Sequence, residues 1–215
     1  MALKLYSYWR SSAAYRLRIA LAFKGVAYET IAVNIAPGKN EQVGEDFRAI
    51  NPQMRVPALE ADGTVMTQSM AILEWLDEMY PEPSLLPGDA WLRQQIRTAA
   101  DIIACDIHPL NNLSVLKALR QDIGATDDAV SHWYADWIHR GFAAIEKTAE
   151  RSNGHKFLFG DTPTLAEICL VPQVYNARRF NVDLTAFPRL TEVDAACLEL
   201  DAFKQAVPEN QPDAT

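Results

Sequence analysis

Residues 7–21 read SYWRSSAAYRLRIAL, and this segment decides how the first part of the chain is interpreted. Residues 3–6 precede it as LKLY, which predicts a short buried strand. After it, apolar residues recur at helical spacing up to Gly25, a typical helix terminator. Ser11 and Ser12 therefore lie where a strand passes into a helix.

Two interpretations of this serine pair are open. Backbone N–H groups at the start of a helix, together with serine hydroxyls, would bind an anion such as a thiolate. Serine is also a favourable N-cap residue, so Ser11 or Ser12 could simply cap the helix. Taken alone, the segment favours capping, but the segments that follow shift the balance towards anion binding.

Composition restricts the class of protein. The chain has 215 residues and a formal net charge of −8, which argues against a nucleic-acid partner. An acidic substrate would therefore need a local basic pocket. We find no apolar run long enough to span a membrane and no signal peptide. Cys105, Cys169 and Cys197 form neither a CxxC motif nor a metal-ligand spacing, so we expect no metal and reduced core cysteines in a cytoplasmic protein.

The order of predicted elements divides the chain into two domains. Strand, helix, strand, helix, hairpin and helix follow one another through residues 1–81, which is the order of a thioredoxin-like α/β domain. Residues 82–90 form a linker, because prolines at 81, 83 and 87 exclude regular structure. Residues 91–215 show no credible strand pair and are predicted to be all helical.

Several features of this second half are specific enough to test. A helix over 91–119 should be kinked or interrupted at Pro109. The sequence TLAE from Thr164 fits a capping box at the start of a buried helix. A last helix is predicted over about 190–206, followed by a loose tail over 210–215.

Two further segments of the first domain suggest a ligand. If Val56-Pro57 is a cis peptide, Val56 can offer its backbone groups to an extended peptide; the alternative is an ordinary edge-strand proline. Gln68 and Ser69 at a helix start suit a carboxylate, although Ser69 alone would be an ordinary N-cap. Together with the serine turn, these segments predict a small anionic tripeptide that carries a thiol, and glutathione fits that description.

With these motifs in place, the chain closely resembles zeta-class glutathione transferases, the family of maleylacetoacetate and maleylpyruvate isomerases. The resemblance runs from residue 3 to about 213. It is most specific at 11–21, SSAAYRLRIAL, which is similar to the zeta signature S-S-C-x-W/Y-R-V-R-I-A-L. It extends to 51–57, 68–69, 106–112 and 171–180. The resemblance implies a glutathione-transferase fold, α/β plus all-α, and a homodimer.

One residue departs from the family pattern. Ala13 stands where the zeta signature has a cysteine. The resemblance still implies an isomerase, but chemistry that needs a second thiol is put in doubt by this alanine.

The resemblance also implies roles for individual residues. Ser11, with Ser12 beside it, would stabilise the glutathione thiolate. Arg10 and Arg179 would face the substrate carboxylates, with Arg178 as the surface neighbour that could be mistaken for Arg179. Glutathione itself would be held by six further residues: Gln42, Val56, Gln68, Ser69, His108 and Asn112.

The activity implied is glutathione-dependent cis–trans isomerisation of a maleyl dicarboxylate. Such an isomerisation needs a thiolate, a donor that stabilises it, and cations for two carboxylates, for which arginine is well suited. Maleylacetoacetate from tyrosine and phenylalanine breakdown is the first candidate substrate, and maleylpyruvate from gentisate breakdown is the nearest alternative. Broader alternatives are a glutathione transferase or dehalogenase of small halo acids, and a non-catalytic glutathione-binding protein.

Overall fold

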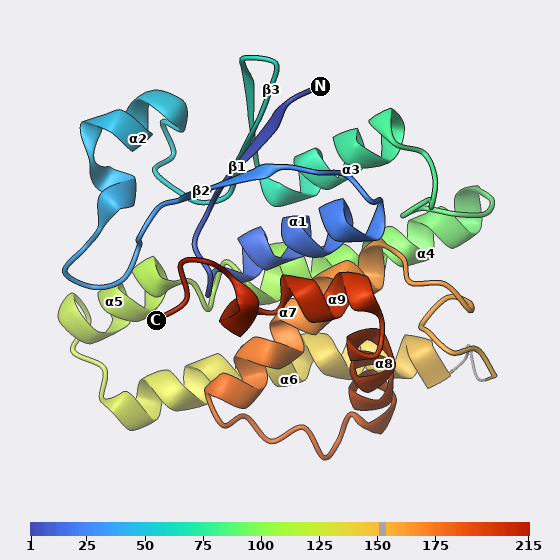
Figure 1. The fold of residues 1–215 in the computed structure, drawn as a ribbon. Helices are drawn as coiled ribbons and strands as arrows, with labels where there is room; N and C mark the ends of the chain where they lie inside the picture. Colours follow the sequence, from blue (N-terminus) through green and yellow to red (C-terminus); the bar gives the residue numbers. More distant parts are fainter. Residues whose placement is uncertain (151–153) are drawn as a thin grey trace. The chain divides into compact units, whose positions relative to one another are not determined.

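The computed structural model describes residues 1–150 and 154–215, which form two compact units (Figure 1). The first unit consists of residues 1–84 and 199–215, and the second of residues 85–198. The first is an α/β unit and the second is helical, as predicted. Residues 199–215 group with the first unit, whereas the expected boundary placed them in the helical domain.

A mixed sheet of four short strands organises the first unit. Its order is β2 (Glu29–Ala32), β1 (Leu3–Ser7), β3 (Ala58–Ala61), β4 (Thr64–Thr67). Strand β1 pairs in parallel with β2 and antiparallel with β3, and β3 and β4 form the predicted hairpin. This is the sheet of a thioredoxin-like domain.

Side chains alternate between the two faces of β1. Leu5 lies opposite Leu59 of β3, and both side chains are completely buried. Tyr6 packs on the other face against Phe47 of α2 (Glu45–Ile50), with the ring centroids 6.1 Å apart. The sheet is therefore buried on both faces, and the predicted helix over 45–50 is confirmed.

Two helices of the first unit pack against α1 (Ser12–Phe23). α3 (Ser69–Met79) and α9 (Asp201–Ala206) both contact it (Figure 1). The ammonium of Lys24, which follows α1, forms an ion pair of 2.8 Å with Asp77 of α3 and is fully buried. These contacts fix the direction in which the first turn of α1 is presented.

The C-terminal residues differ from the prediction. The single helix expected over 190–206 is two helices, α8 (Pro188–Leu198) and α9, because the backbone at Leu200 is extended. The tail over 210–215 is not loose, because Ala214 packs against the cluster that includes Tyr8 and Trp9.

The second unit is built from helices whose apolar faces pack on one another. α4 (Ala90–Asp101) packs against α7 (Leu165–Arg179), and α7 packs against α8. Both α5 (Leu113–Gln121) and α8 pack against α6 (Asp127–Ala149). The predicted capping box at the start of α7 is present, with Thr164 and Glu167 as its two members. Over the two described ranges, no helix is long and apolar enough to cross a membrane.

The interruption predicted at Pro109 takes the form of a π-helix over Ile102–Ile107. The N–H of His108 donates to the carbonyl of Ile103 at 2.9 Å, and Pro109 has no N–H with which to continue a helix. The π-helix packs closely on α6 at Gly141, where an added Cβ would lie 2.4 Å from the Ile107 side chain. This close approach requires a glycine.

The three cysteines form no disulfide within the described residues, and only two of them are in the core. Cys169 and Cys197 are completely buried. Cys105 is exposed on the π-helix, so its predicted place in the core is wrong. The prediction rested on the usual burial of reduced cysteine, which does not take into account that Cys105 lies on a π-helix.

Candidate functional site

The turn between β1 and α1 presents Ser11 as the N-cap of the helix. Its Oγ accepts the N–H of Ala14 at 3.3 Å. That bond occupies a lone pair of the oxygen and leaves the hydroxyl hydrogen to donate elsewhere. Capping and donation to an anion are therefore compatible at Ser11. Ser12 follows as the first helical residue and is 6% exposed, and Ala13 is buried beside it.

Arg10, the residue before Ser11, places a positive charge next to this N-cap. Its guanidinium carbon lies 4.4 Å from the centroid of the Trp9 ring, and Nη2 donates to the Tyr8 hydroxyl at 3.4 Å. Its Nε is buried, and no hydrogen-bond partner for it lies in the described part of the chain. Two aromatic side chains thus orient Arg10, which retains N–H donors for an anionic ligand.

Arg18 holds the backbone of the same turn in place. It is 1% exposed. Nη2 donates to the carbonyl of Trp9 at 2.9 Å and Nη1 to the Ser7 hydroxyl at 3.3 Å. Nε reaches the carbonyl of Ala206 in α9 at 3.1 Å. Arg18 therefore links the turn to α9, and this contact was not predicted from the sequence.

The start of α3 carries two residues that were predicted for the site, Gln68 and Ser69, and Ser69 contacts Arg16, which was not predicted. Gln68 precedes the helix with φ of 70°, a conformation that a non-glycine residue rarely adopts and that costs about 1–3 kcal/mol. Its side chain donates to Gln53 at 2.8 Å. Ser69 is 8% exposed, and its Oγ accepts an N–H of the buried Arg16 at 3.2 Å.

The loop before β3 adjoins this helix start. The Val56-Pro57 peptide is cis, which answers the question that the sequence left open, and Val56 is 9% exposed. The loop is closed by Asn51, whose side-chain amide donates to the carbonyl of Arg55 at 2.6 Å. Gln53 in the same loop bonds Gln68, so the predicted segments around Val56 and Gln68 are joined.

Gln42 lies apart from these contacts, in the 3₁₀ turn Glu41–Val43. Its Oε1 is buried and has no hydrogen-bond partner among the described residues. The side chain thus retains a buried acceptor, but its role in ligand binding stays a prediction.

His108 and Asn112 lie in the second unit, on either side of the break between the π-helix and α5. His108 is half-buried. Asn112 is the N-cap of α5, with Oδ1 accepting the N–H of Ser114 at 3.0 Å. Its neighbour Asn111 is buried and donates to the carbonyl of Tyr134 at 2.9 Å. Asn112 therefore caps α5, whereas its predicted role is to bind glutathione.

The last turn of α7 carries two arginines in different environments. Arg178 forms an ion pair of 2.5 Å with Asp194, whose side chain is 1% exposed. The guanidinium of Arg179 instead lies 4.7 Å from the Phe180 ring, which stacks on Tyr134 at 4.1 Å. Over residues 1–150 and 154–215, no carboxylate pairs with Arg179. Of the two arginines, Arg179 is the one without a carboxylate partner in the described part of the chain.

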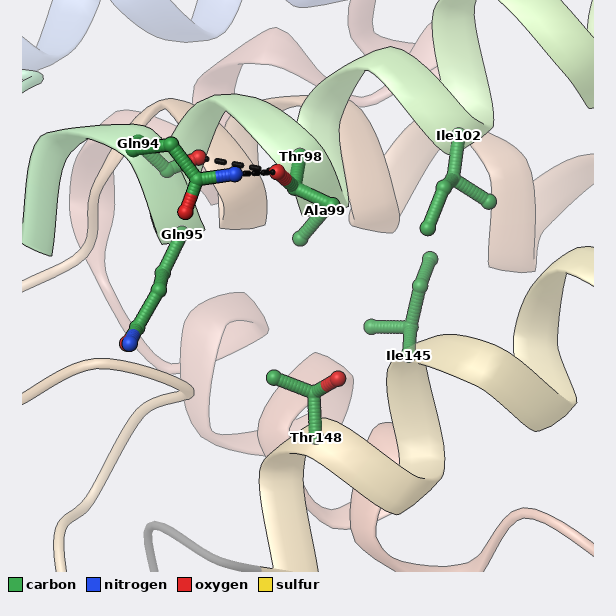
Figure 2. A pocket seen from close by; sticks show the side chains of 7 residues that line it. All are labelled: Gln94, Gln95, Thr98, Ala99, Ile102, Ile145 and Thr148. Carbon is green, nitrogen blue, oxygen red and sulfur yellow. Dashed lines mark hydrogen bonds between the residues drawn. The ribbon is translucent and has the colours of Figure 1, made fainter. Parts of the chain in front are cut away.

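A separate pocket of about 410 Å³ lies between α4 and α6 in the second unit (Figure 2). Gln94 bonds Thr98 at its rim at 2.7 Å, and Ile102 and Ile145 line its apolar side. The full lining is Gln94, Gln95, Thr98, Ala99, Ile102, Ile145 and Thr148. None of these residues is charged and none was predicted for the site, so this pocket does not suit a dicarboxylate.

The predicted site residues therefore fall in both units. The first unit holds Arg10, Ser11, Ser12, Gln42, Val56, Gln68 and Ser69, and the second holds His108, Asn112 and Arg179. Sequence analysis missed Arg16 and Arg18. The available signal was two arginines four and six residues after Ser12, in a helix of otherwise apolar residues.

Comparison with known proteins places this geometry in a family. Residues 1–78 match the model of the glutathione S-transferase N-terminal domain, and residues 127–196 match that of the C-terminal domain. A maleylpyruvate isomerase from Ralstonia sp is 52% identical over 213 residues, which cover 99% of this chain and 100% of the relative.

Two solved structures agree with this match. A zeta-class maleylpyruvate isomerase, a bacterial glutathione transferase in its holo form, superposes with a TM-score of 0.95 at 52% identity and covers 99% and 100% of the two chains. A maleylacetoacetate isomerase from Anaeromyxobacter dehalogenans, with bound dicarboxyethyl glutathione and citrate, gives a TM-score of 0.87 at 45% identity and covers 100% and 94%.

The chain belongs to the glutathione S-transferase family, and within that family it is a member of the zeta class. Glutathione is the cofactor of this class of protein. The first unit fits that tripeptide, because it offers a serine hydroxyl at a helix start and buried polar atoms of Arg16 and Gln42 without partners in the described chain.

Proposed function

We propose that this protein catalyses the glutathione-dependent cis–trans isomerisation of a maleyl dicarboxylate. The observation that carries the proposal is the arrangement of Ser11 and Arg10 at the start of α1. A hydroxyl with a free hydrogen and an oriented cation stand at adjacent positions, which suits a thiolate and a substrate carboxylate. Relatives named for this reaction support the same activity.

The residues proposed to hold glutathione have separate tasks. Ser11 and Ser12 would contact the sulfur, Gln42 and Val56 the peptide groups, and Gln68 with Ser69 the γ-glutamyl end. His108 and Asn112 complete the proposed set. When bound, glutathione supplies a nucleophilic thiolate, the chemistry that rotation about a conjugated double bond requires.

Ser11 would act by stabilising the anionic form of the sulfur. Its O–H donates a charge-assisted hydrogen bond, and the positive end of the α1 dipole adds to the effect. Both lower the pKa of a bound thiol, so more thiolate is present at neutral pH. Ala13 contributes no second thiol, so the thiolate would depend on Ser11 and the helix start.

Arg10 and Arg179 would recognise the two carboxylates of the substrate. A guanidinium pairs with a carboxylate through two parallel N–H bonds and stays charged at neutral pH. Such local cations are needed because the net charge of the chain is −8 and would otherwise repel a dianion. The ion pair of Arg178 with Asp194 supports assigning this role to Arg179.

Maleylacetoacetate and maleylpyruvate are the two candidate substrates, in that order. Support for the second comes from the name of the relative that is 52% identical. Measuring kcat/KM for both, with a small halo acid alongside, tests the proposal. We expect at least one maleyl compound to be isomerised about a hundredfold more efficiently than the halo acid is dehalogenated. A reversed order would support the dehalogenase alternative.

We also propose that the protein is a cytoplasmic homodimer. Trp91 is 77% exposed, and a large aromatic surface of this kind is typical of an interface. The three cysteines form no disulfide within the described residues, which suits a reducing compartment. Sedimentation velocity tests the dimer: a Trp91→Glu variant should shift the population towards monomer, and a monomeric wild-type protein would contradict the proposal.

A further inference from the structure

Arg16 lies buried beneath the start of α3 with most of its hydrogen-bonding capacity unused. It projects from the second turn of α1 and is 2% exposed. Nη1 donates to Ser69 Oγ at 3.2 Å, whereas Nε and Nη2 have no hydrogen-bond partner in the described part of the chain. No carboxylate among residues 1–150 and 154–215 pairs with it.

A buried guanidinium without a counter-ion is costly. Arg18, two residues further along the same helix, shows the usual solution, because each of its nitrogens donates to a carbonyl or hydroxyl. Arg16 lacks such partners: beside Ser69, only its Nη1 has an acceptor in the described part of the chain. A site that accepts an anion at this point would provide the missing counter-charge.

The bond between Arg16 and Ser69 also determines what Ser69 can do. The N–H of Arg16 occupies a lone pair of Ser69 Oγ, so the hydroxyl hydrogen must donate in another direction. Ser69 is the first residue of α3, where backbone N–H groups and the helix dipole also favour an anion. The charge of Arg16, the Ser69 hydroxyl hydrogen and the N-terminal N–H groups of α3 therefore all favour an anion at the start of α3. Gln68, the residue before Ser69, has a strained backbone conformation.

We propose that Arg16 is a positioning residue for the α-carboxylate of the γ-glutamyl group of glutathione. It orients the Ser69 hydroxyl as a donor and places a buried positive charge behind the start of α3. This inference rests on the proposed glutathione site. It assigns the preference for that carboxylate to a residue that does not itself have to touch the ligand.

Two glutathione analogues separate the carboxylate from the rest of the tripeptide. Glutaryl-cysteinylglycine lacks the γ-glutamyl amine and keeps the carboxylate, whereas 4-aminobutyryl-cysteinylglycine lacks the carboxylate and keeps the amine. Their dissociation constants, measured by calorimetry, report on binding without any turnover. For the wild-type protein we expect the carboxylate-free analogue to bind at least tenfold more weakly than the other. A difference below threefold would overturn the proposal.

Neutral variants of Arg16 then test its part in this preference. Arg16→Met and Arg16→Gln should weaken glutathione and glutaryl-cysteinylglycine by about ten- to a hundredfold and the carboxylate-free analogue by less than threefold. Arg16→Lys, which retains the charge, should stay within about fivefold of wild type for all three. Circular dichroism identifies which variants fold, and the wild-type comparison stands whether or not they do.

The outcomes distinguish this inference from the proposed function. Equal weakening of all three ligands by Arg16→Met would make Arg16 merely structural and overturn the inference, while glutathione binding by the wild type would leave the proposed function intact. A wild-type protein that bound none of the three ligands would instead contradict the proposed function, and the inference with it.

Discussion

The carboxylate of Asp213 accepts the backbone N–H of Trp9 at 3.0 Å, although 204 positions separate the two residues in sequence. The ring of Trp9 forms a cation–π contact with the guanidinium of Arg10, and Trp9 lies two residues before Ser11. Asp213 thus helps to hold the turn before α1, which presents the proposed catalytic hydroxyl of Ser11. This relationship leads to the first prediction.

Asp213→Ala should loosen this turn. The buried N–H of Trp9 would lose its partner, which costs about 1–3 kcal/mol. We expect faster hydrogen exchange at the Trp9 amide and a three- to tenfold weaker dissociation constant for glutathione. Asp213→Asn keeps an oxygen acceptor and should restore most of the protection. If Asp213→Ala exchanged no faster than Thr215→Ala, a change at the exposed last residue, the tail would have no part in holding the turn.

Ser11→Ala should raise the pKa of the bound thiol and slow isomerisation. Losing one charge-assisted hydrogen bond corresponds to about 1.5–3 kcal/mol, or roughly ten- to a hundredfold in rate. Thiolate absorbance as a function of pH measures the change. Glutathione affinity should fall less, because the other contacts remain.

The cap at Ser11 complicates this variant, so it needs a matched control. Thr126 caps α6 with the same kind of bond, to the N–H of Ala129 at 3.2 Å. Thr126→Ala should lose a similar cap energy of about 0.5–2 kcal/mol without moving the thiol titration. An unchanged titration in Ser11→Ala would remove Ser11 from the mechanism and make Ser12 the candidate.

Arg179→Met should lower kcat/KM for the dicarboxylate by about ten- to a hundredfold, the scale of one lost charge-assisted pair. Conjugation of glutathione to an uncharged substrate should be nearly unchanged. Arg178→Met, measured on folded protein, should do little to either activity because its partner is Asp194. A parallel loss of both activities in Arg179→Met would make Arg179 a structural residue, and damage confined to Arg178→Met would transfer the role to Arg178.

Arg178→Met should instead lower the free energy of unfolding, by an amount that depends on pH. Burial raises the pKa of Asp194 above its ordinary value of 3.8, and Arg178 opposes that rise. A carboxyl with a raised folded-state pKa favours the folded state when protonated and loses that contribution as pH rises through the folded-state pKa. Without Arg178, that pKa rises further and the ionised Asp194 stays buried without its partner.

The destabilisation should therefore be about 1–3 kcal/mol at neutral pH and shrink as the pH falls below the folded-state pKa of Asp194. Urea unfolding at several pH values between 4 and 8 (a range set around the ordinary carboxyl pKa) measures it. Arg140→Met is a suitable control, because Arg140 pairs with Asp136 at an exposed position of α6. A pH-independent difference between wild type and Arg178→Met would contradict this account.

Local patterns were sufficient for most of the fold. The strand before Ser11, the hairpin at Asp62-Gly63 and the capping box at Thr164 depend on residues that are neighbours in sequence, and the structure contains all three. The break at Leu200 was missed because no glycine or proline marks it. The contact of Asp213 was missed because no local pattern reports a partner 204 positions away.

The site divides in the same way. The sequence placed Ser11, Gln68 and Ser69 at helix starts, where the structure has them, because helix starts have a recognisable composition. The burial of Arg16 and Arg18 could not be predicted, because a charged residue in an amphipathic helix is usually on its solvated face. Their environments come from Ser69 in α3 and Ala206 in α9, which only the folded unit brings to α1.

The most direct test of the central claim is the number of isomerisations per molecule of glutathione. Maleylpyruvate or maleylacetoacetate at a hundredfold excess over glutathione is followed by proton NMR, while free thiol is titrated in parallel. We expect complete conversion of the cis to the trans isomer with no loss of free thiol. Conversion that stopped after one equivalent, with the thiol consumed, would show a conjugating transferase and contradict the proposed isomerase.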